Sequence, residues 1–302
     1  MDRLTFPGIA TPLPAARDVL ELLKPVTWFP PIWAFMCGVV SSGVPIAERW
    51  PFLVAGVLLT GPLVCGTSQA VNDWFDRHVD AINEPNRPIP SGRIAGHWGL
   101  WIAIAGTALS LLVAWATGPL VLAATCLGLL CAWGYSAPPF RFKVSGIWGP
   151  AVVALTYEGL TWFTGATLMA GALPGTDILL ILALYSVGAH GIMTLNDFKA
   201  VEGDRAMGLR SLPVTLGVGP AAQVACVVMA APQVAVIALL VSWGHLLVAG
   251  IIAALLLGQI VLMRRLLSDP LRHTPWYNAT GTSLYVLGML ASAFGLGGVG
   301  GL

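Results

Sequence analysis

Long apolar runs, separated by short polar or glycine- and proline-containing segments, dominate the chain. A helix of about 20 apolar residues is long enough to cross a bilayer. Nine runs approach or exceed that length, at residues 26–44, 52–73, 97–116, 119–136, 148–171, 177–197, 217–241, 244–263 and 278–297. The composition agrees, because 57% of the residues are hydrophobic and only 10% are charged, whereas soluble domains have about 25% charged residues. The pattern predicts an all-α integral membrane protein with nine transmembrane helices, folded as a single domain over residues 1–302.

The basic residues indicate how these helices are oriented. If the N-terminal segment 1–24 is cytoplasmic, the segments between runs at about 76–96, 137–147, 198–216 and 264–277 are cytoplasmic as well. Every lysine and arginine except Arg49 then lies on the cytoplasmic side, as the positive-inside rule requires. We therefore expect a cytoplasmic N-terminus. The net charge of +1 gives no electrostatic reason to expect a nucleic-acid partner.

The most polar stretch of the chain runs from Asn72 to Gly92 and begins at the end of the second apolar run. Asn72, Asp76 and Asp80 are spaced four residues apart, so on a helix each is rotated only about 40° from the one before and the three share a face. Oxygen ligands in this arrangement suit Mg²⁺, which is usually held by one or two carboxylates and by substrate phosphates. Asp73 lies about 100° from Asn72 and is a weaker ligand candidate. The alternative, a solvated loop whose acids pair with nearby arginines, does not explain the spacing.

A second acidic stretch, Asn196 to Arg205, follows the sixth run. On a continuous helix Asp197 and Asp204 nearly superpose, because they are seven residues apart, whereas Glu202 points elsewhere. The two stretches lie four runs apart and point the same way, which suggests a parallel four-helix repeat with one extra helix. Two acidic faces would hold metal ions around one diphosphate. The expected metal ligands are Asn72, Asp76, Asp80, Asn196, Asp197, Glu202 and Asp204.

Basic side chains close to these stretches are suited to binding a diphosphate. Arg141 and Lys143 follow Tyr135 in a proline-containing loop, where two cations could face a leaving diphosphate through charge-assisted hydrogen bonds. The expected diphosphate-binding residues are Lys24, Arg77, Arg87, Tyr135, Arg141, Lys143 and Arg205. For Arg87 and Arg141 an anchoring role at the cytoplasmic membrane surface is an equal alternative. We expect Asp76, Asp80, Asp204 and Lys143 to be catalytic.

Three further residues are candidates for lining a cavity within the membrane. Glu158 lies near the middle of the fifth run, and acids at such depth usually mark functional sites. His190 precedes Asp197 by seven residues and shares its helix face, and the ring of Tyr157 could stabilise a carbocation. For Glu158 and His190 the alternative is a hydrogen-bonded packing residue.

With both acidic stretches in place, the chain resembles the intramembrane prenyltransferase family typified by 4-hydroxybenzoate polyprenyltransferase. The motif N-D-x-x-D-x-x-x-D at residues 72–80 and the second motif at residues 196–204 carry the resemblance, which covers nearly the whole length. It implies helices around a central cavity in which both motifs bind Mg²⁺ and a prenyl diphosphate. Many members have an acid where this chain has Ala200, which leaves Asp197 or Glu202 as the substitute.

Within that family the chain is most similar to the chlorophyll-synthase branch, through K-P-V-T-W-F-P-P (24–31), N-D-W-F-D-R (72–77), R-P-I-P-S-G (87–92), Y-S-A-P-P (135–139) and N-D-F-K-A-V-E-G-D (196–204). The resemblance implies transfer of a geranylgeranyl or phytyl group to the propionate of bacteriochlorophyllide. It places the protein in the inner or intracytoplasmic membrane of a purple photosynthetic bacterium, in contact with other proteins of pigment biosynthesis.

Two alternatives stay open at this point. One is a different acceptor in the same family, such as chlorophyllide, a quinone precursor or haem. The other is a cation-coupled transporter with paired acidic helices at a repeat interface. The acids lie at the cytoplasmic ends of the helices rather than at mid-membrane, which favours the enzyme.

Overall fold

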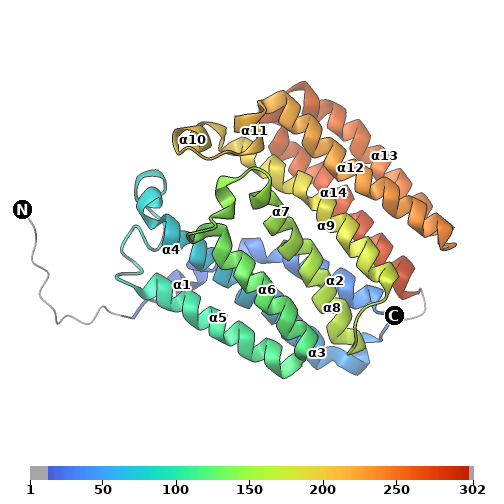
Figure 1. Ribbon diagram of the computed structural model, residues 1–302, viewed down its shortest axis with the longest axis horizontal. Helices are drawn as coiled ribbons and strands as arrows, with labels where there is room; N and C mark the ends of the chain where they lie inside the picture. Colours follow the sequence, from blue (N-terminus) through green and yellow to red (C-terminus); the bar gives the residue numbers. More distant parts are fainter. Residues whose placement is uncertain (1–12, 299–302) are drawn as a thin grey trace, which may run out of the picture.

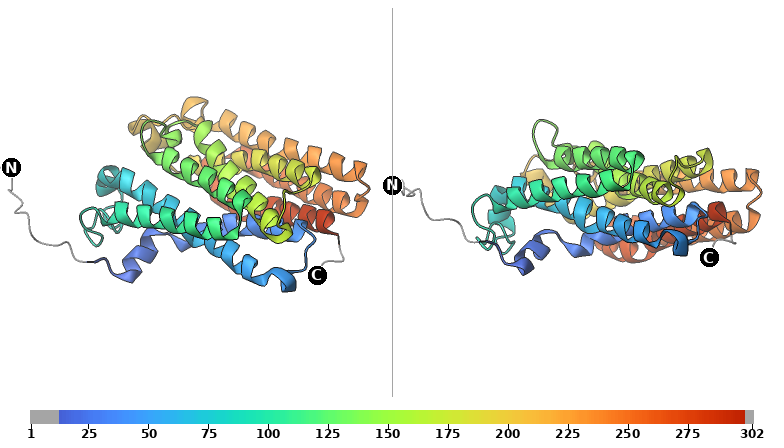
Figure 2. Two further views of the ribbon diagram at one scale, coloured as in Figure 1. Left: turned by 60° about the horizontal axis from the view of Figure 1, so that its bottom comes forward. Right: turned by 90° about the horizontal axis from the view of Figure 1, so that it is seen from below.

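The computed structural model describes residues 13–298, and within that range every regular element is helical. The one departure in this part of the chain is an isolated β-bridge between Ser145 and Arg210. The long helices run alongside one another in an elongated bundle (Figures 1 and 2). The all-helical fold predicted from the apolar runs is therefore confirmed.

The first part of the chain forms short helical elements up to Ser41 and then three long helical stretches. Its elements are α1 (Ala16–Leu22), η1 (Pro25–Trp28), α2 (Phe29–Ser41), α3 (Ile46–Leu58), η2 (Leu59–Cys65), α4 (Gly66–Asn83), α5 (Trp98–Thr117) and α6 (Pro119–Ser136). The elements α3, η2 and α4 are continuous, so the second predicted run extends past residue 73 to Asn83. The π-helical turn η2 contains Pro62, which has no N–H to donate to a regular α-helical ladder.

The second part contains the remaining long helices and the short ones that carry the second acidic stretch. Its elements are η3 (Phe142–Val144), α7 (Trp148–Ala154), η4 (Leu155–Leu160), α8 (Thr161–Ala170), α9 (Thr176–Asn196), η5 (Asp197–Lys199), α10 (Val201–Ala206), α11 (Leu212–Thr215), α12 (Val218–Ser242), α13 (Leu246–Ser268) and α14 (Pro270–Gly297). The segment 264–277, expected to lie outside the helices, is helical except at Asp269. The side chain of Asp269 accepts a hydrogen bond from the Arg272 N–H and caps α14.

Seven helical stretches in the described residues are long and apolar enough to cross a membrane: 46–83, 98–117, 119–136, 176–199, 218–242, 246–268 and 270–297. The other two predicted runs are helical as well. The run at 26–44 forms η1 and the short helix α2, and the run at 148–171 forms α7, η4 and α8. The second of these carries the buried acid Glu158 inside its π-helical turn η4.

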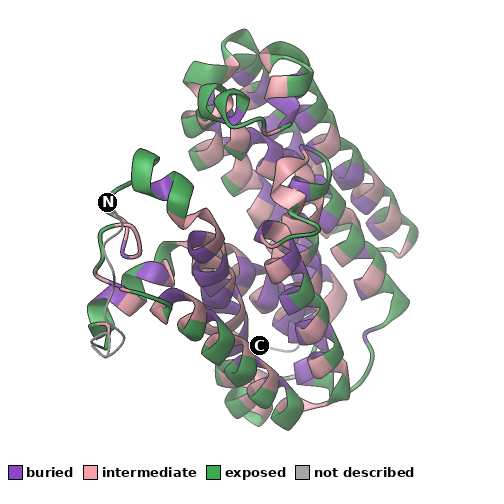
Figure 3. Cartoon of the chain, turned by 60° about the vertical axis from the view of Figure 1, so that its left-hand side comes forward, coloured by how far each residue is buried: buried purple, intermediate pink, exposed green. Residues whose placement is uncertain are grey.

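Buried residues face the interior of the bundle, and the outer faces of the long helices are exposed (Figure 3). Those outer faces are apolar: Leu112 and Trp115 on α5 and Leu257 and Val261 on α13 are all more than half exposed. Apolar side chains on the outside of long apolar helices are what a lipid environment requires. The multi-pass membrane character predicted from composition follows from these surfaces.

Helices α2 and α8 cross at two glycines, one on each helix. A Cβ atom at Gly38 would lie 2.1 Å from the Trp162 carbonyl oxygen, and one at Gly165 would lie 2.1 Å from the Phe35 carbonyl oxygen. The two backbones therefore touch, as is usual where small residues mediate helix packing in membranes. This contact fixes α8, and with it the continuous turn η4, against α2.

The N-terminal helix α1 is tied to the loop that follows α4. The Arg93 guanidinium donates hydrogen bonds to Asp18 Oδ1 at 2.7 Å and to Glu21 Oε1 at 2.7 Å. These bonds to Arg93 hold the pKa of Glu21 below its usual value. The end of α4, the loop after α6 and α10 lie at the same end of the bundle, on the upper left of Figure 1.

Candidate active site

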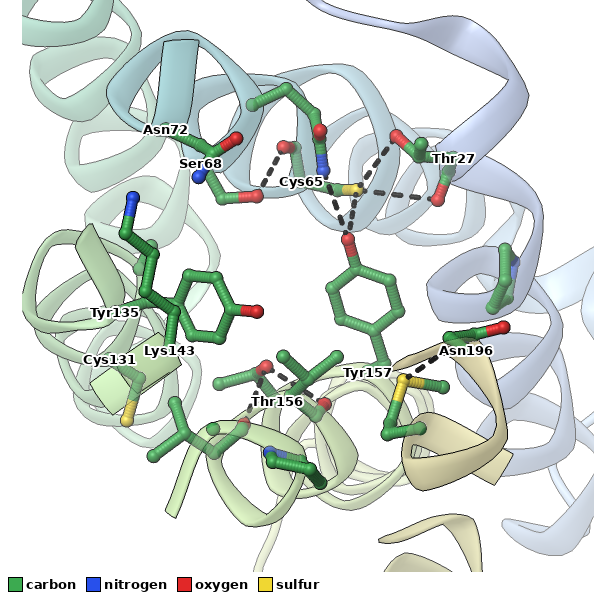
Figure 4. Close-up of a pocket in the computed structure, with 18 of the residues that line it drawn as sticks. Thr27, Cys65, Ser68, Asn72, Cys131, Tyr135, Lys143, Thr156, Tyr157 and Asn196 are labelled. Carbon is green, nitrogen blue, oxygen red and sulfur yellow. Dashed lines mark hydrogen bonds between the residues drawn. The ribbon is translucent and has the colours of Figure 1, made fainter. Parts of the chain in front are cut away.

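A cavity of about 600 Å³ opens among α2, α4, α6, η4 and α9, and both acidic stretches contribute to its wall. Its oxygen-bearing lining includes Asn72 and Asp76 from α4 and Asn196, Asp197 and Asp204 from the second stretch. Lys143, Tyr135 and Tyr157 line it as well (Figure 4). The structure thus brings the two stretches, more than a hundred residues apart in the chain, to one space.

Helix α4 presents two different faces, and only one of them meets the cavity. Asn72 and Asp76 line it, but Asp80 does not. Two steps of four residues rotate Asp80 by about 80° from Asn72, which brings it almost into line with Asp73, seven residues earlier. The expected sharing of one face by Asn72, Asp76 and Asp80 therefore holds for the first two alone.

On the cavity side, α4 is joined to the loop after α6. The Asn72 amide donates hydrogen bonds to Asp76 Oδ2 at 2.9 Å and to Ser136 Oγ at 3.1 Å. Lys143 forms a short ion pair with Asp76 through Oδ1, and its side chain is only 11% exposed. Figure 4 shows Lys143 extending past Tyr135 toward Asn72.

Lys143 is positioned by backbone contacts between two loops. The Arg210 N–H donates to the Val144 carbonyl at 2.9 Å, and the Gly146 N–H donates to the Arg210 carbonyl at 2.8 Å. A Cβ atom at Gly146 would lie 2.5 Å from the Leu212 nitrogen, so this approach requires glycine. The segment after the second acidic stretch therefore holds the lysine that contacts the first.

The other face of α4 carries an ion network centred on Asp73, which is completely buried. Its Oδ1 accepts from Lys24 Nζ at 2.7 Å and from Arg87 Nη1 at 3.3 Å, and Arg87 also donates to Asp80 at 2.9 Å. Arg87 completes the network with two hydrogen bonds to Glu84. This network lies outside the cavity lining and includes Lys24, Arg87 and Asp80. Direct contacts between these three residues and a diphosphate or a metal stay predictions.

The second acidic stretch is not one continuous helix. Helix α9 ends at Asn196, the 3₁₀ turn η5 follows, and α10 begins at Val201. The break at Ala200 (φ −120°, ψ 10°) separates Asp197 from Asp204, yet both line the cavity. Glu202 lies on the exposed side of α10, outside the lining, as the helical rotation predicts.

Three other basic residues expected at the diphosphate lie outside the cavity lining. Arg77 stacks on the Trp74 ring, 4.1 Å from its centre, and donates to the Trp74 carbonyl at 2.6 Å. Arg141 and Arg205 are exposed. Arg77 is held by the tryptophan because the two lie three residues apart on the same helix, where i,i+3 side chains meet.

The residues expected deep in the membrane divide between the cavity and the packed core. Tyr157 lines the cavity, and its hydroxyl accepts hydrogen bonds from Gln69 Nε2 and from the Cys65 thiol, each at 3.3 Å. Glu158 and His190 do not line it. His190 makes a 3.1 Å hydrogen bond with the Ile147 carbonyl, which fits the packing role, and Glu158 Oε2 is buried without a partner among the described residues.

Several polar residues of the lining were not singled out by the sequence. They are Thr27, Thr60, Ser68, Gln69, Ser145, Thr156, Thr161, Lys199 and Ser211. Lys199 carried a usable signal, because it lies three residues after Asn196 and so on the same face if the turn continues. The hydroxyl residues carried none, because serine and threonine are common in membrane helices whatever their role.

The donors around the cavity fit divalent ions that are shared with a ligand. No group of three or more His, Cys, Asp or Glu residues close enough to hold one ion occurs within residues 13–298. The cavity instead offers carboxylate and amide oxygens from two opposite stretches. Mg²⁺ suits this arrangement, because it is usually bound through one or two carboxylates and completed by substrate phosphates and water.

Comparison with known proteins identifies the family. The model of the UbiA prenyltransferase family matches residues 27–297. The chain belongs to this family. It is 58% identical to the bacteriochlorophyll synthase 33 kDa chain of Cereibacter sphaeroides and 53% identical to that of Rhodobacter capsulatus, over 95% of this chain and 95% of each relative. It is 37% identical to the chloroplastic chlorophyll synthase of Arabidopsis thaliana over 91% of this chain and 73% of that protein.

Solved structures support the same fold. A UbiA homologue from Archaeoglobus fulgidus bound to DMAPP and Mg²⁺ superposes with a TM-score of 0.73, at 22% identity, over 92% of this chain and 98% of that one. A structure concerned with digeranylgeranylglyceryl phosphate synthase gives a TM-score of 0.71 at 20% identity, over 93% and 97% of the two chains. Membership of a prenyltransferase family disfavours the transporter alternative.

Proposed function

We propose that this protein transfers a geranylgeranyl or phytyl group from its diphosphate to the propionate carboxylate of bacteriochlorophyllide a, giving bacteriochlorophyll a. The observation that carries the proposal is one cavity lined by both acidic stretches and by Lys143. The 58% identity to a bacteriochlorophyll synthase over 95% of both chains supports the choice of acceptor.

The diphosphate would lie between the two acidic stretches. Asn72 and Asp76 on one side, and Asn196, Asp197 and Asp204 on the other, would hold Mg²⁺ ions in common with its oxygens. Bound there, Mg²⁺ offsets the negative charge that develops on the leaving diphosphate. Lys143 lies beside Asp76, so its ammonium is within reach of the same oxygens and adds charge-assisted hydrogen bonds.

The prenyl chain would lie along the apolar part of the wall. That part includes Val64, Cys131, Val152 and Val153, from helices on opposite sides. The rings of Tyr135 and Tyr157 face the same space (Figure 4). Aromatic faces attract cations, so the two tyrosines stabilise positive charge spreading over the allylic carbons.

The acceptor needs no general base. A propionate is already ionised near neutral pH, so one carboxylate oxygen supplies the electron pair for the new bond to C1. The C1–O bond breaks with its electron pair going to the diphosphate, and no proton moves.

For the membrane arrangement we propose nine crossings, a cytoplasmic N-terminus and an active site near the cytoplasmic face of the inner or an intracytoplasmic membrane. The seven long apolar helices would be joined by α2 and by the continuous α7, η4 and α8. The end of α4, the loop after α6 and α10 carry basic residues and lie at one end of the bundle (Figure 1), which supports a cytoplasmic location for that end by the positive-inside rule. Arg49, the one basic residue assigned to the opposite side, pairs there with the Met169 carbonyl at the end of α8.

The test uses membranes from a heterologous host that expresses the full chain. Geranylgeranyl diphosphate and Mg²⁺ are added with bacteriochlorophyllide a, chlorophyllide a or 4-hydroxybenzoate in parallel, and EDTA serves as the control. Mg²⁺-dependent esterification of bacteriochlorophyllide is the expected result. Product on 4-hydroxybenzoate alone would support prenyl transfer and reject the pigment as acceptor. Absence of product with all three acceptors would reject the proposal.

A further inference from the structure

The proposed acceptor is negatively charged, so it would be repelled by other negative groups in the cavity. Its nucleophile is a carboxylate, and it has to approach C1 beside a diphosphate and among Asp76, Asp197 and Asp204. Like charges this close repel, and the repulsion is strong where water is scarce. A cation in the wall that is not already paired with an acid would offset the charge of the incoming carboxylate.

Two cationic side chains of the described chain line the cavity, Lys143 and Lys199. Lys143 is committed to Asp76 by its ion pair and is largely buried. Lys199 is exposed, lies at the end of the 3₁₀ turn η5, and forms no side-chain hydrogen bond or salt bridge within residues 13–298. Lys199 interacts electrostatically with the neighbouring Asp197 without a direct side-chain contact, so its ammonium can still donate hydrogen bonds to a ligand.

The position of Lys199 fits an acceptor that enters from outside. The cavity, at about 600 Å³, has the size of a pocket for one small molecule, and in the proposed function the prenyl diphosphate fills it. A macrocycle as large as bacteriochlorophyllide extends only its propionate arm into the remaining space. This arm would first meet residues that both line the cavity and are exposed to the outside. Lys199 is such a residue.

We propose that Lys199 binds the carboxylate of the acceptor and guides it to C1. The ammonium keeps its proton throughout; it forms a charge-assisted hydrogen bond with one carboxylate oxygen while the other oxygen makes the new bond to carbon. The other charged residues that line the cavity are Asp197 and Asp204 from its own segment, and Asp76 and Lys143 from elsewhere in the chain. This role rests on the proposed function, because only a carboxylate acceptor needs it.

The kinetic test compares Lys199→Met and Lys199→Arg with Arg264→Met. Arg264 is an exposed residue of α13 outside the cavity, so its replacement removes one positive charge without touching the site. We expect Lys199→Met to raise KM for bacteriochlorophyllide at least tenfold and to change KM for geranylgeranyl diphosphate less than twofold. Lys199→Arg should recover most of the acceptor affinity, and Arg264→Met should match the parent protein.

A binding test measures the contribution of Lys199 to pigment affinity in the absence of turnover. Bacteriochlorophyllide and its propionate methyl ester are titrated into purified protein in EDTA, and binding is followed by the pigment's absorbance. The parent protein should prefer the free acid about tenfold, and Lys199→Met should bind both forms alike. Equal preference in the parent and the variant would overturn the proposal.

Other outcomes separate this proposal from the proposed function. A rise in KM for geranylgeranyl diphosphate, with KM for the pigment unchanged, would assign Lys199 to the diphosphate and overturn the acceptor role. If the parent protein esterifies bacteriochlorophyllide and Lys199→Met does so with unchanged constants, the acceptor role fails while the proposed function stands. If the folded parent protein esterifies no pigment, the proposed function fails and the role of Lys199 falls with it.

Discussion

The buried carboxylate of Asp73 allows a quantitative prediction about stability. Asp73 is inaccessible to solvent, while its partners Lys24 and Arg87 are 23% and 25% exposed. Asp73→Asn keeps the shape of the side chain and removes its charge, leaving two cations without their common counter-ion. Breaking a fully buried ion pair costs about 3–5 kcal/mol, and partial hydration of the two cations lowers this, so we expect a loss of about 2–3 kcal/mol.

Glu84→Gln provides the matched control, because Glu84 contacts the same arginine. The Glu84 carboxylate accepts two hydrogen bonds from Arg87, at 2.6 and 2.7 Å, which are shorter than the 3.3 Å bond from Arg87 to Asp73. Glu84 is 55% exposed, however, and exposed ion pairs contribute about 0–1 kcal/mol. Burial, rather than the length of the hydrogen bonds, should therefore rank the two variants.

The assay is reversible unfolding of the purified protein by SDS in mixed micelles, with Lys24→Met as a third variant. The double variant Asp73→Asn/Lys24→Met should lose less stability than the sum of the single losses, because the second change removes a cation that the first left unpaired. Equal losses for Asp73→Asn and Glu84→Gln would show that the network does not depend on burial. Simple additivity of Asp73→Asn and Lys24→Met would show that the two residues are not coupled.

Three further predictions concern catalysis and packing. Asp76→Ala should lower prenyl transfer more than about 100-fold, measured with labelled geranylgeranyl diphosphate, because it removes a proposed Mg²⁺ ligand as well as the ion-pair partner of Lys143; residual Mg²⁺-dependent activity near the parent level would contradict this. Gly165→Ala should prevent recovery of monodisperse protein, since its Cβ atom would meet a carbonyl oxygen at 2.1 Å, whereas Gly250→Ala, with open space around it, should be tolerated. Gln233→Leu should cost about 1 kcal/mol by leaving Gln259 unpaired inside the bundle, and adding Gln259→Leu should restore part of that loss in the same unfolding assay.

The sequence determined the helices and the existence of two acidic stretches. Apolar length and composition are local properties, and a bilayer leaves a helix as the only way to pair the backbone of such a run. Regular spacing also determined that Asn72 and Asp76 share a face, because four residues are close to one helical turn. The breaks around the second stretch were less accessible from the sequence, since the turn η5 packs against α11 and α14, which lie further along the chain.

Tertiary structure decided which charged residues meet the cavity. Lys24 and Asp73 lie 49 residues apart, and no local pattern shows that they pair. Lys143 lines the cavity, whereas Arg141, only two residues earlier, does not. The loop that carries both is held by a backbone hydrogen bond between Val144 and Arg210, which are far apart in the sequence. Sequence alone supplies the inventory of charged groups; the distances that separate an ion network from a ligand site exist only once the helices pack.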